Sequence, residues 1–501
     1  MPNGLEEREL WTTISNGHFW SVDEEILVQQ IYAAFRPETN RLRSACAIER
    51  NTPPVLDGNL PRTPSEILFD GENYDEVNRT YVGILALRWT WNDDYERFTR
   101  GQVEKLKLTR KSFRWLHDYF RNILRTPMDL LTIVLAMVVN DLGKDHSLIN
   151  DLHKLTGTTL VGRNHDTILL EAAHAGIIPS LRYLDGEHRQ DFMLGLELGS
   201  ELNAGQLAQA ENVPVNLEGL LTMQGHERAF NLKFIEQILD VAGAAGHVYA
   251  DGIKNLIEPV FQAFKTVHEV SLCIIRKDCN LRQGYDQVLS KRAALLHDEG
   301  FKLLSVAKED ERALLRLLTM GRAATLETAK LLQAAFDDVD PYHRQLLIEG
   351  LNIDAIEDNE TAVIPYYMPA MIAETIRSTR GSGKEQEALT SLMRYLSKAL
   401  KYEDVENANT WSPLSPTRES SATWPLTLPL PKLSIHIPAP TDTRRRQTRE
   451  GRVIERNMSS ARETISSPRF KEDPSVLDGL PPPEGHLLSR RRTSHSRLSR
   501  L

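Results

Sequence analysis

The chain has 501 residues, a length that accommodates two or three domains of ordinary size. It is 41% apolar and carries a net charge of −9. The charge is uneven, because residues 403–501 hold 16 Lys and Arg against 12 Asp and Glu, whereas the preceding part holds 44 against 57. This acidic body argues against general nucleic-acid binding, which requires basic surface.

Secreted and membrane-spanning classes are also disfavoured. Three cysteines, Cys46, Cys273 and Cys279, are too few for a disulfide framework, and their odd number suits a reducing compartment. The segment Met1–Trp20 has no apolar centre of the kind found in a signal peptide. The longest apolar run, Leu130–Val139, is shorter than the roughly 20 residues that cross a bilayer. We therefore expect a cytoplasmic protein without a transmembrane segment.

The sequence predicts an all-α fold in three regions. Residues 1–72 contain one helical stretch, Val22–Phe35, followed by a Pro- and Asn-rich connector over Arg36–Asp70, and we expect this region to pack on the next domain. Residues 73–402 form a helical domain. Residues 403–501, which hold 12 of the 25 prolines, are predicted to be a disordered tail rich in Pro, Ser and Arg.

Within residues 73–402, apolar side chains recur every three or four positions, as in amphipathic helices. This periodicity predicts helices near 80–91, 102–125, 127–141, 146–155, 165–175, 188–210, 231–243, 250–276, 285–300, 307–318, 323–336, 340–351, 365–378 and 384–400.

The predicted helix from Pro127 to Asp141 is apolar on almost every side, which places it at the centre of a bundle. Thr126 is a good N-cap, and Pro127 suits the first helical position. Two polar residues, Asn140 and Asp141, stand at the other end. Downstream, Asn164 is predicted to cap the next helix and Gly176 to end it.

Histidines and acids follow one another in a definite order along residues 100–260. His117 precedes the central helix, which ends in Asn140-Asp141-Leu142-Gly143-Lys144. His165 and His174 come next, and His247 precedes Tyr249-Ala250-Asp251. This series resembles the HD-domain superfamily of metal-dependent phosphohydrolases and related helical oxygenases. The layout of a globular part with a tail also resembles that of uncharacterised fungal proteins.

The resemblance implies a divalent metal ion, Mn, Fe, Mg or Zn, and a small phosphorylated substrate. It assigns metal ligation to seven residues: His117, Asn140, Asp141, His165, His174, His247 and Asp251. Asp141 and Lys144 would be catalytic, the carboxylate by bridging metals or taking a proton and Lys144 by contacting phosphate, with Arg163 as a further phosphate contact.

One departure from the family pattern leaves a second hypothesis open. The family pairs a histidine with the aspartate at the end of the central helix, and this chain has Asn140 there. An amide oxygen is a weaker ligand for Zn, Fe or Mn than imidazole is. The alternative is therefore a catalytically inactive HD-like scaffold or interaction protein, regulated through its tail. Taken singly, each of these histidines and acids also fits an ordinary helix end.

The tail holds candidate interaction sites. Ser412, Ser415 and Ser467 each precede proline, as in targets of proline-directed kinases. Pro429-Leu430-Pro431 could adopt the extended form that polyproline-reading domains bind. Two arginine triplets, Arg444–Arg446 and Arg490–Arg492, fit a nuclear-import signal and equally a signal for an anionic membrane surface, so a nuclear location stays open beside the cytoplasmic one.

Overall fold

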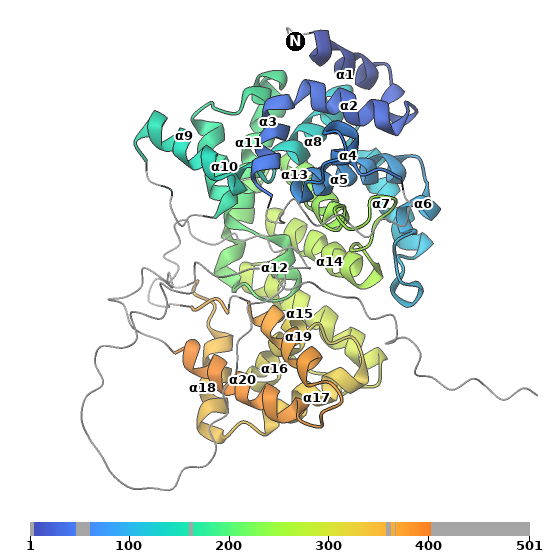
Figure 1. The fold of residues 1–501 in the computed structure, drawn as a ribbon. Helices are drawn as coiled ribbons and strands as arrows, with labels where there is room; N and C mark the ends of the chain where they lie inside the picture. Colours follow the sequence, from blue (N-terminus) through green and yellow to red (C-terminus); the bar gives the residue numbers. More distant parts are fainter. Residues whose placement is uncertain are drawn as a thin grey trace, which may run out of the picture. The chain divides into compact units, whose positions relative to one another are not determined.

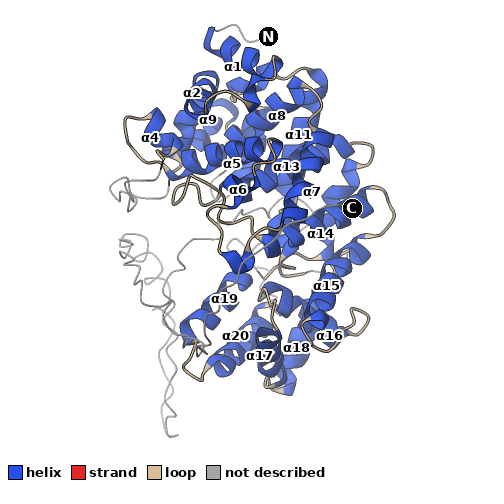
Figure 2. Ribbon diagram, turned by 90° about the vertical axis from the view of Figure 1, so that its right-hand side faces the viewer, coloured by secondary structure: helices blue, strands red, loops and turns tan. Residues whose placement is uncertain are grey.

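The computed structural model describes residues 5–46, 61–158, 160, 164–356, 362–365 and 367–401. In this part of the chain every regular element is a helix (Figure 2), which confirms the all-α prediction. The predicted tail, Arg163 and part of the connector lie outside the described residues. All described residues belong to one unit, Met1–Pro431, whereas the second unit, Lys432–Leu501, contains none of them.

The first region holds more helix than the sequence indicated. The helices are α1 (Leu5–Ser15), α2 (Glu24–Ala34), α3 (Arg36–Ser44) and α4 (Pro64–Leu68). The predicted connector thus contributes α3 and α4. The reason is that Pro37 and Pro64 stand in the first turns of these helices, where proline is compatible with helix. Helix α1 contacts the central helix described next.

Helix α8 (Pro127–Val139) lies at the centre of the bundle, as predicted. It contacts α1, α3, α5 (Asp75–Trp91), α11 (Gly186–Glu201) and α13 (Glu227–Gly243) (Figure 1). Thr126 and Asp129 form a capping box at its start, and nearly all of its side chains are buried. Apolar residues on every side suit it to this position.

Helices α5 and α13 approach each other closely because two glycines face the neighbouring backbone. A Cβ on Gly243 would lie 2.1 Å from the carbonyl oxygen of Arg79, and one on Gly83 would lie 2.8 Å from that of Leu239. Side chains on α5 are consequently brought against those on α13.

The other helices before residue 280 surround this centre. They are α6 (Tyr95–Thr99), α7 (Arg110–Ile123), α9 (His146–Thr156), α10 (His165–His174), α12 (Ala204–Ala208) and α14 (Glu258–Ile275), with short 3₁₀ turns at η1 (His18–Trp20), η2 (Glu104–Leu106), η3 (Leu142–Lys144), η4 (Pro179–Tyr183) and η5 (Pro214–Met223).

Three predicted helices are shorter or divided. Helix α7 begins at Arg110 because Thr109 caps it, and the predicted helix 188–210 is split because Asn203 caps α12. Helix α14 begins at Glu258, beyond a loop in which Gly252 has φ 154°. The predicted caps Asn164 and Gly176 are confirmed.

The last helices are α15 (Leu281–Asp298), α16 (Glu309–Met320), α17 (Leu326–Asp337), α18 (Pro341–Asn352), α19 (Met368–Thr379) and α20 (Glu385–Ala399). Contacts run from α15 to α14, α16 and η5, and α18 and α20 pack together. Two arginines of α16, Arg312 and Arg316, are fully buried.

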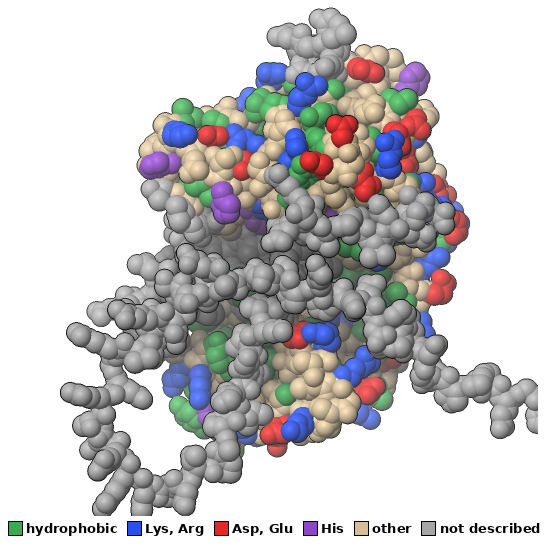
Figure 3. Space-filling model, in the orientation of Figure 1, with side chains coloured by type: hydrophobic (Ala, Val, Ile, Leu, Met, Phe, Trp, Pro, Cys, Tyr) green, Lys and Arg blue, Asp and Glu red, His purple; other side chains and the backbone are tan. Residues whose placement is uncertain are grey.

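In the described residues no single helix has the length and apolar character needed to cross a membrane. Arg110–Ile123 and Pro127–Lys144 meet that test only as a pair bent by 117°. On the face drawn in Figure 3, acidic and basic side chains lie interspersed.

Candidate functional site

Asp141 lies at the end of α8, where the chain turns into η3, and its side chain is buried. The turn fits closely against the start of α10. A Cβ on Gly143 would lie 1.9 Å from the carbonyl oxygen of His165, so only glycine permits this approach. The Asp-Leu-Gly-Lys turn of the sequence therefore serves to bring Asp141 and His165 together.

Two carboxyl groups and two cations meet beside this turn. The Nζ of Lys144 lies 2.8 Å from Oδ1 of Asp141 and 3.2 Å from both carboxyl oxygens of Glu76 on α5. Arg79, one turn along α5, donates from Nη1 to Oε1 of Glu76 at 2.8 Å. All four groups lie on or next to helices that contact α8 or α10.

The two carboxyl groups share one proton. Burial, followed by the charge of Asp141, raises the pKa of Glu76 to about 8. Burial also opposes ionisation of Asp141, but Lys144, Arg79 and a hydrogen bond with Glu76 hold the pKa of Asp141 well below its usual range. At neutral pH, Asp141 is therefore the ionised member and Glu76 the protonated one.

His165 and Asp240 complete the group, which we call the Asp141 cluster: Glu76, Arg79, Asp141, Lys144, His165 and Asp240. The Nε2 of His165 lies 3.9 Å from Oδ1 of Asp141. Asp240 projects from the last turns of α13. Burial and then the charge of Asp141 raise the pKa of Asp240, while Arg79, Lys144 and His165 lower it.

A second buried ion pair adjoins this cluster. Lys233 of α13 lies 2.6 Å from Oε2 of Glu236, and burial raises the pKa of Glu236 to about 7. Lys233, Glu236 and Asn140 line a small cavity of about 20 Å³, enough for about one water molecule. Asn140, predicted as a weak metal ligand, thus faces this cavity.

The other predicted ligands have different partners. His117 contacts the neighbouring Asp118 at 2.9 Å, and His174 lies 3.9 Å from Glu197 at the surface. Both carboxyl oxygens of Asp251 are taken by arginines, Arg97 at 2.7 Å and Arg100 at 2.6 Å. These contacts lie apart from the Asp141 cluster, and Asp251 is ion-paired with two arginines.

His247 is affected by the charge of Arg79, a member of the Asp141 cluster. Burial and then the charge of Arg79 lower the pKa of His247, which keeps the imidazole neutral. Its buried Nδ1 has no hydrogen-bond partner within the part of the chain that the structure describes.

The donor set does not fit the metal ion that the resemblance implies. Among the described residues, no three His, Cys, Asp or Glu side chains converge in the way that a metal ion requires. The Lys144 ammonium and the Arg79 guanidinium instead neutralise Asp141 and its neighbours. A metal ion placed there would be repelled by both cations.

Sequence reasoning found Asp141, Lys144 and His165 but missed Glu76, Arg79 and Asp240. For Glu76 and Arg79, the sequence did contain a pattern that could have pointed to them. Glu76 and Arg79 are three residues apart, a spacing that pairs charges on one helix face, at the start of a helix whose later residues are mostly apolar. Asp240 had no such signal, because a single acid near a helix end is common.

Residues 28–477 match the model of a family of unknown function (DUF6829). The chain belongs to that family. No curated protein and no solved structure matches it. The matched range runs from α2 through the helical part and well into the sequence after residue 402.

Proposed function

We propose that this protein is a non-catalytic helical scaffold, with an ion-pair network where the HD-like resemblance implies a metal site. The observation that carries the proposal is the position of Lys144. Its ammonium lies 2.8 Å from Asp141 and 3.2 Å from Glu76, so it compensates the carboxylates that a metal would otherwise bind. Arg79 adds a second cation.

The scaffold reading also accounts for the proton on Glu76. Buried carboxylates that exceed their counter-charges take up protons rather than remain ionised. The raised pKa values of Glu76, Glu236 and Asp240 are of this kind. The cluster thus balances its charge from within the chain, as a structural network does.

The partners of such a scaffold would be recruited through the tail. Its Ser-Pro sites, its Pro429–Pro431 stretch and its arginine triplets are the features of the sequence that kinases and polyproline-reading domains recognise. In this proposal the helical part supplies a stable platform and residues 403–501 supply the contacts.

The competing candidate is the divergent HD-like hydrolase acting on a small phosphorylated substrate. It is favoured by one observation, the gathering of Asp141, His165 and Asp240 from three separate elements. The donor set, however, does not fit the metal ion on which such catalysis would depend.

One experiment separates the two candidates. Full-length protein is equilibrated with Mn²⁺, Zn²⁺, Fe²⁺ or Mg²⁺, freed of excess metal and submitted to elemental analysis, beside Lys144→Met and Asp141→Asn. If the protein is a scaffold, we expect little bound metal in the wild type. We also expect Lys144→Met to bind more metal than the wild type, because its carboxylates no longer have the ammonium group beside them. Stoichiometric metal in the wild type, lost in Asp141→Asn together with phosphatase activity, would establish the hydrolase instead.

A further inference from the structure

Two cysteines at the junction of α14 and α15 lie within bonding distance. Cys273 stands in the last turn of α14, and Cys279 comes just before Asn280, the N-cap of α15. Their Cα atoms are 5.6 Å apart, a separation that a disulfide spans, and the structure joins them. Both cysteines are half-buried, and the residues between 275 and 279 are exposed, so small molecules can reach the pair.

The turn itself holds the two cysteines together. The backbone N–H groups of Asp278 and Cys279 donate to the carbonyl oxygen of Cys273 at 2.9 and 3.3 Å. Lys277 adopts a left-handed conformation, with φ 61°, that closes the turn. Since these contacts involve backbone only, the two thiols would remain neighbours after reduction.

Cys279 lies at the N-terminal end of α15. It precedes the N-terminus of an 18-residue helix, where the helix dipole stabilises negative charge. Of its charged neighbours in the turn, Lys277 adds to this effect and Asp278 opposes it. The remaining cysteine differs, because burial and the neighbouring Asp75 raise the pKa of Cys46 to about 12. Cys46 is therefore a poor nucleophile at neutral pH.

We propose that Cys273 and Cys279 form a reversible thiol–disulfide site whose exchange partner is a small thiol–disulfide couple of the glutathione type. This inference is independent of the scaffold proposal. The Cys279 thiolate attacks one sulfur of the small disulfide, forms a mixed disulfide and releases one small thiolate. The Cys273 thiolate then attacks the Cys279 sulfur and releases the second. The two protons of the protein thiols pass to the two released thiols, and reduction runs the same steps in reverse.

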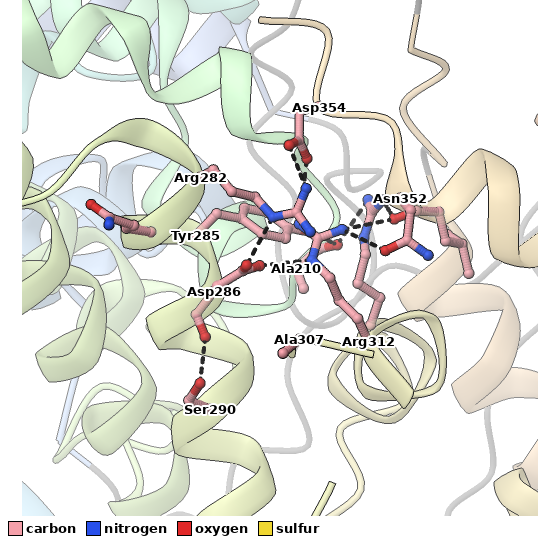
Figure 4. A network of polar contacts seen from close by, with 12 residues as sticks. Ala210, Arg282, Tyr285, Asp286, Ser290, Ala307, Arg312, Asn352 and Asp354 are labelled. Atoms are coloured by element: carbon pink, nitrogen blue, oxygen red, sulfur yellow. Dashed lines mark hydrogen bonds and ion pairs between the residues drawn. The ribbon is translucent and has the colours of Figure 1, made fainter. Parts of the chain in front are cut away.

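The site is placed to act on the start of α15. Three residues after Cys279, Arg282 pairs with Asp286 at 2.8 Å and with Asp354 (Figure 4). Asp286 in turn accepts from the buried Arg312 of α16 at 2.7 Å. The disulfide anchors α14 to the residue before the N-cap of α15, next to this network, so we expect the start of α15 to unfold locally less often in the oxidised form.

The test titrates reduced full-length protein with mixtures of reduced and oxidised glutathione and reads the products by mass spectrometry. We expect the wild type to lose two hydrogens, in a peptide containing Cys273 and Cys279. Cys273→Ser should trap glutathione on Cys279. Cys279→Ser should react more slowly than Cys273→Ser, since it lacks the thiol at the helix N-terminus. Cys46→Ser is the matched control and should behave as the wild type.

Hydrogen exchange on the same samples gives a second readout. Amides in the first turns of α15 should exchange more slowly in the oxidised protein, and this difference should vanish in Cys273→Ser and Cys279→Ser. The proposal is overturned if both thiols stay free at the oxidising end of the titration. It is equally overturned if the disulfide resists excess reduced glutathione in the folded protein, because the bond would then be purely structural.

Discussion

Lys144 is the residue on which the character of the buried site depends. Its Nζ contacts Asp141 and Glu76 from a largely buried position. Removing one partner of a buried ion pair leaves the other charge uncompensated, which costs far more than the pair contributes by existing. We therefore expect a single substitution in this site to lower the stability of the protein strongly, and the substitution of both partners of a pair to lower it only slightly.

Lys144→Met should lower the free energy of unfolding by about 3–5 kcal/mol, because Asp141 loses its nearest cation inside the protein. Chemical denaturation measures the effect. Lys107→Met removes a pair with the exposed Glu104 and should change stability by about 0–1 kcal/mol. The double variant Asp141→Asn/Lys144→Met should recover much of the lost stability. If it were no more stable than Lys144→Met alone, Lys144 and Asp141 would not be coupled as the network requires.

Glu76 predicts a pH dependence of defined sign. Its pKa is about 8 in the folded protein, against 4.5 for an ordinary glutamate. Between these two pKa values the folded state holds a proton that the unfolded state has released. The stabilisation that protonated Glu76 contributes is therefore complete below pH 4.5 and is lost as pH rises through 8. Glu76→Gln keeps a neutral group in place. Between pH 5 and 9 the free energy of unfolding of the variant should rise relative to that of the wild type by a few kcal/mol, since each unit of pKa shift corresponds to about 1.4 kcal/mol.

Unfolding midpoints of wild type and Glu76→Gln across this pH range provide the measurement. Glu104→Gln, at a side chain that is 89% exposed, is the matched control and should run parallel to the wild type. A constant difference between Glu76→Gln and the wild type from pH 5 to 9 would show that Glu76 is ionised throughout.

At the scale of elements, glycines decide which helices can bring their charges together. Gly243 and Gly83 allow α5 and α13 to approach, which sets Glu76 and Arg79 near Asp240, and Gly143 allows η3 to meet α10. Helix periodicity in the sequence predicted most of these helices within a few residues. It did not predict their approach, because the same glycines also read as helix ends or weak helix positions.

Gly243→Ala tests this close approach. The new Cβ would lie 2.1 Å from the Arg79 carbonyl oxygen, so α5 and α13 must separate, and we expect a loss of about 1–3 kcal/mol. Thermal unfolding measures it. The control, Gly195→Ala, meets Lys233 at an ordinary 3.4 Å and should be neutral or gain up to about 1 kcal/mol from helix propensity. A neutral Gly243→Ala would mean that the helices are not in such close contact.

At the scale of the whole molecule, the division between helical part and tail rests on composition. Residues 403–501 are rich in proline and charge and lie outside the described residues, while the family match continues to residue 477. In the scaffold proposal this part serves partners rather than the stability of the helices.

A chain ending at Tyr402 should therefore keep the helical circular dichroism and the unfolding midpoint of the full chain. Differential scanning calorimetry on both chains provides the comparison. A midpoint lowered by several degrees would show that residues after 402 pack on the helices, and the tail would then belong to the folded body.

Periodicity and capping signals in the sequence predict the all-α class, most helix positions, the central place of α8 and the caps at Thr126 and Asn164. These follow from interactions among residues close in the chain, which periodicity and capping rules describe. The packing of the helices, by contrast, shows which distant side chains share the buried site. Glu76, Arg79 and Asp240 join Asp141, and Cys273 pairs with Cys279. Asp251 instead pairs with Arg100, 151 residues away in the sequence, and His117 contacts the adjacent Asp118. Such convergence depends on how whole helices pack and how buried charge is balanced, and neither is written in local spacing.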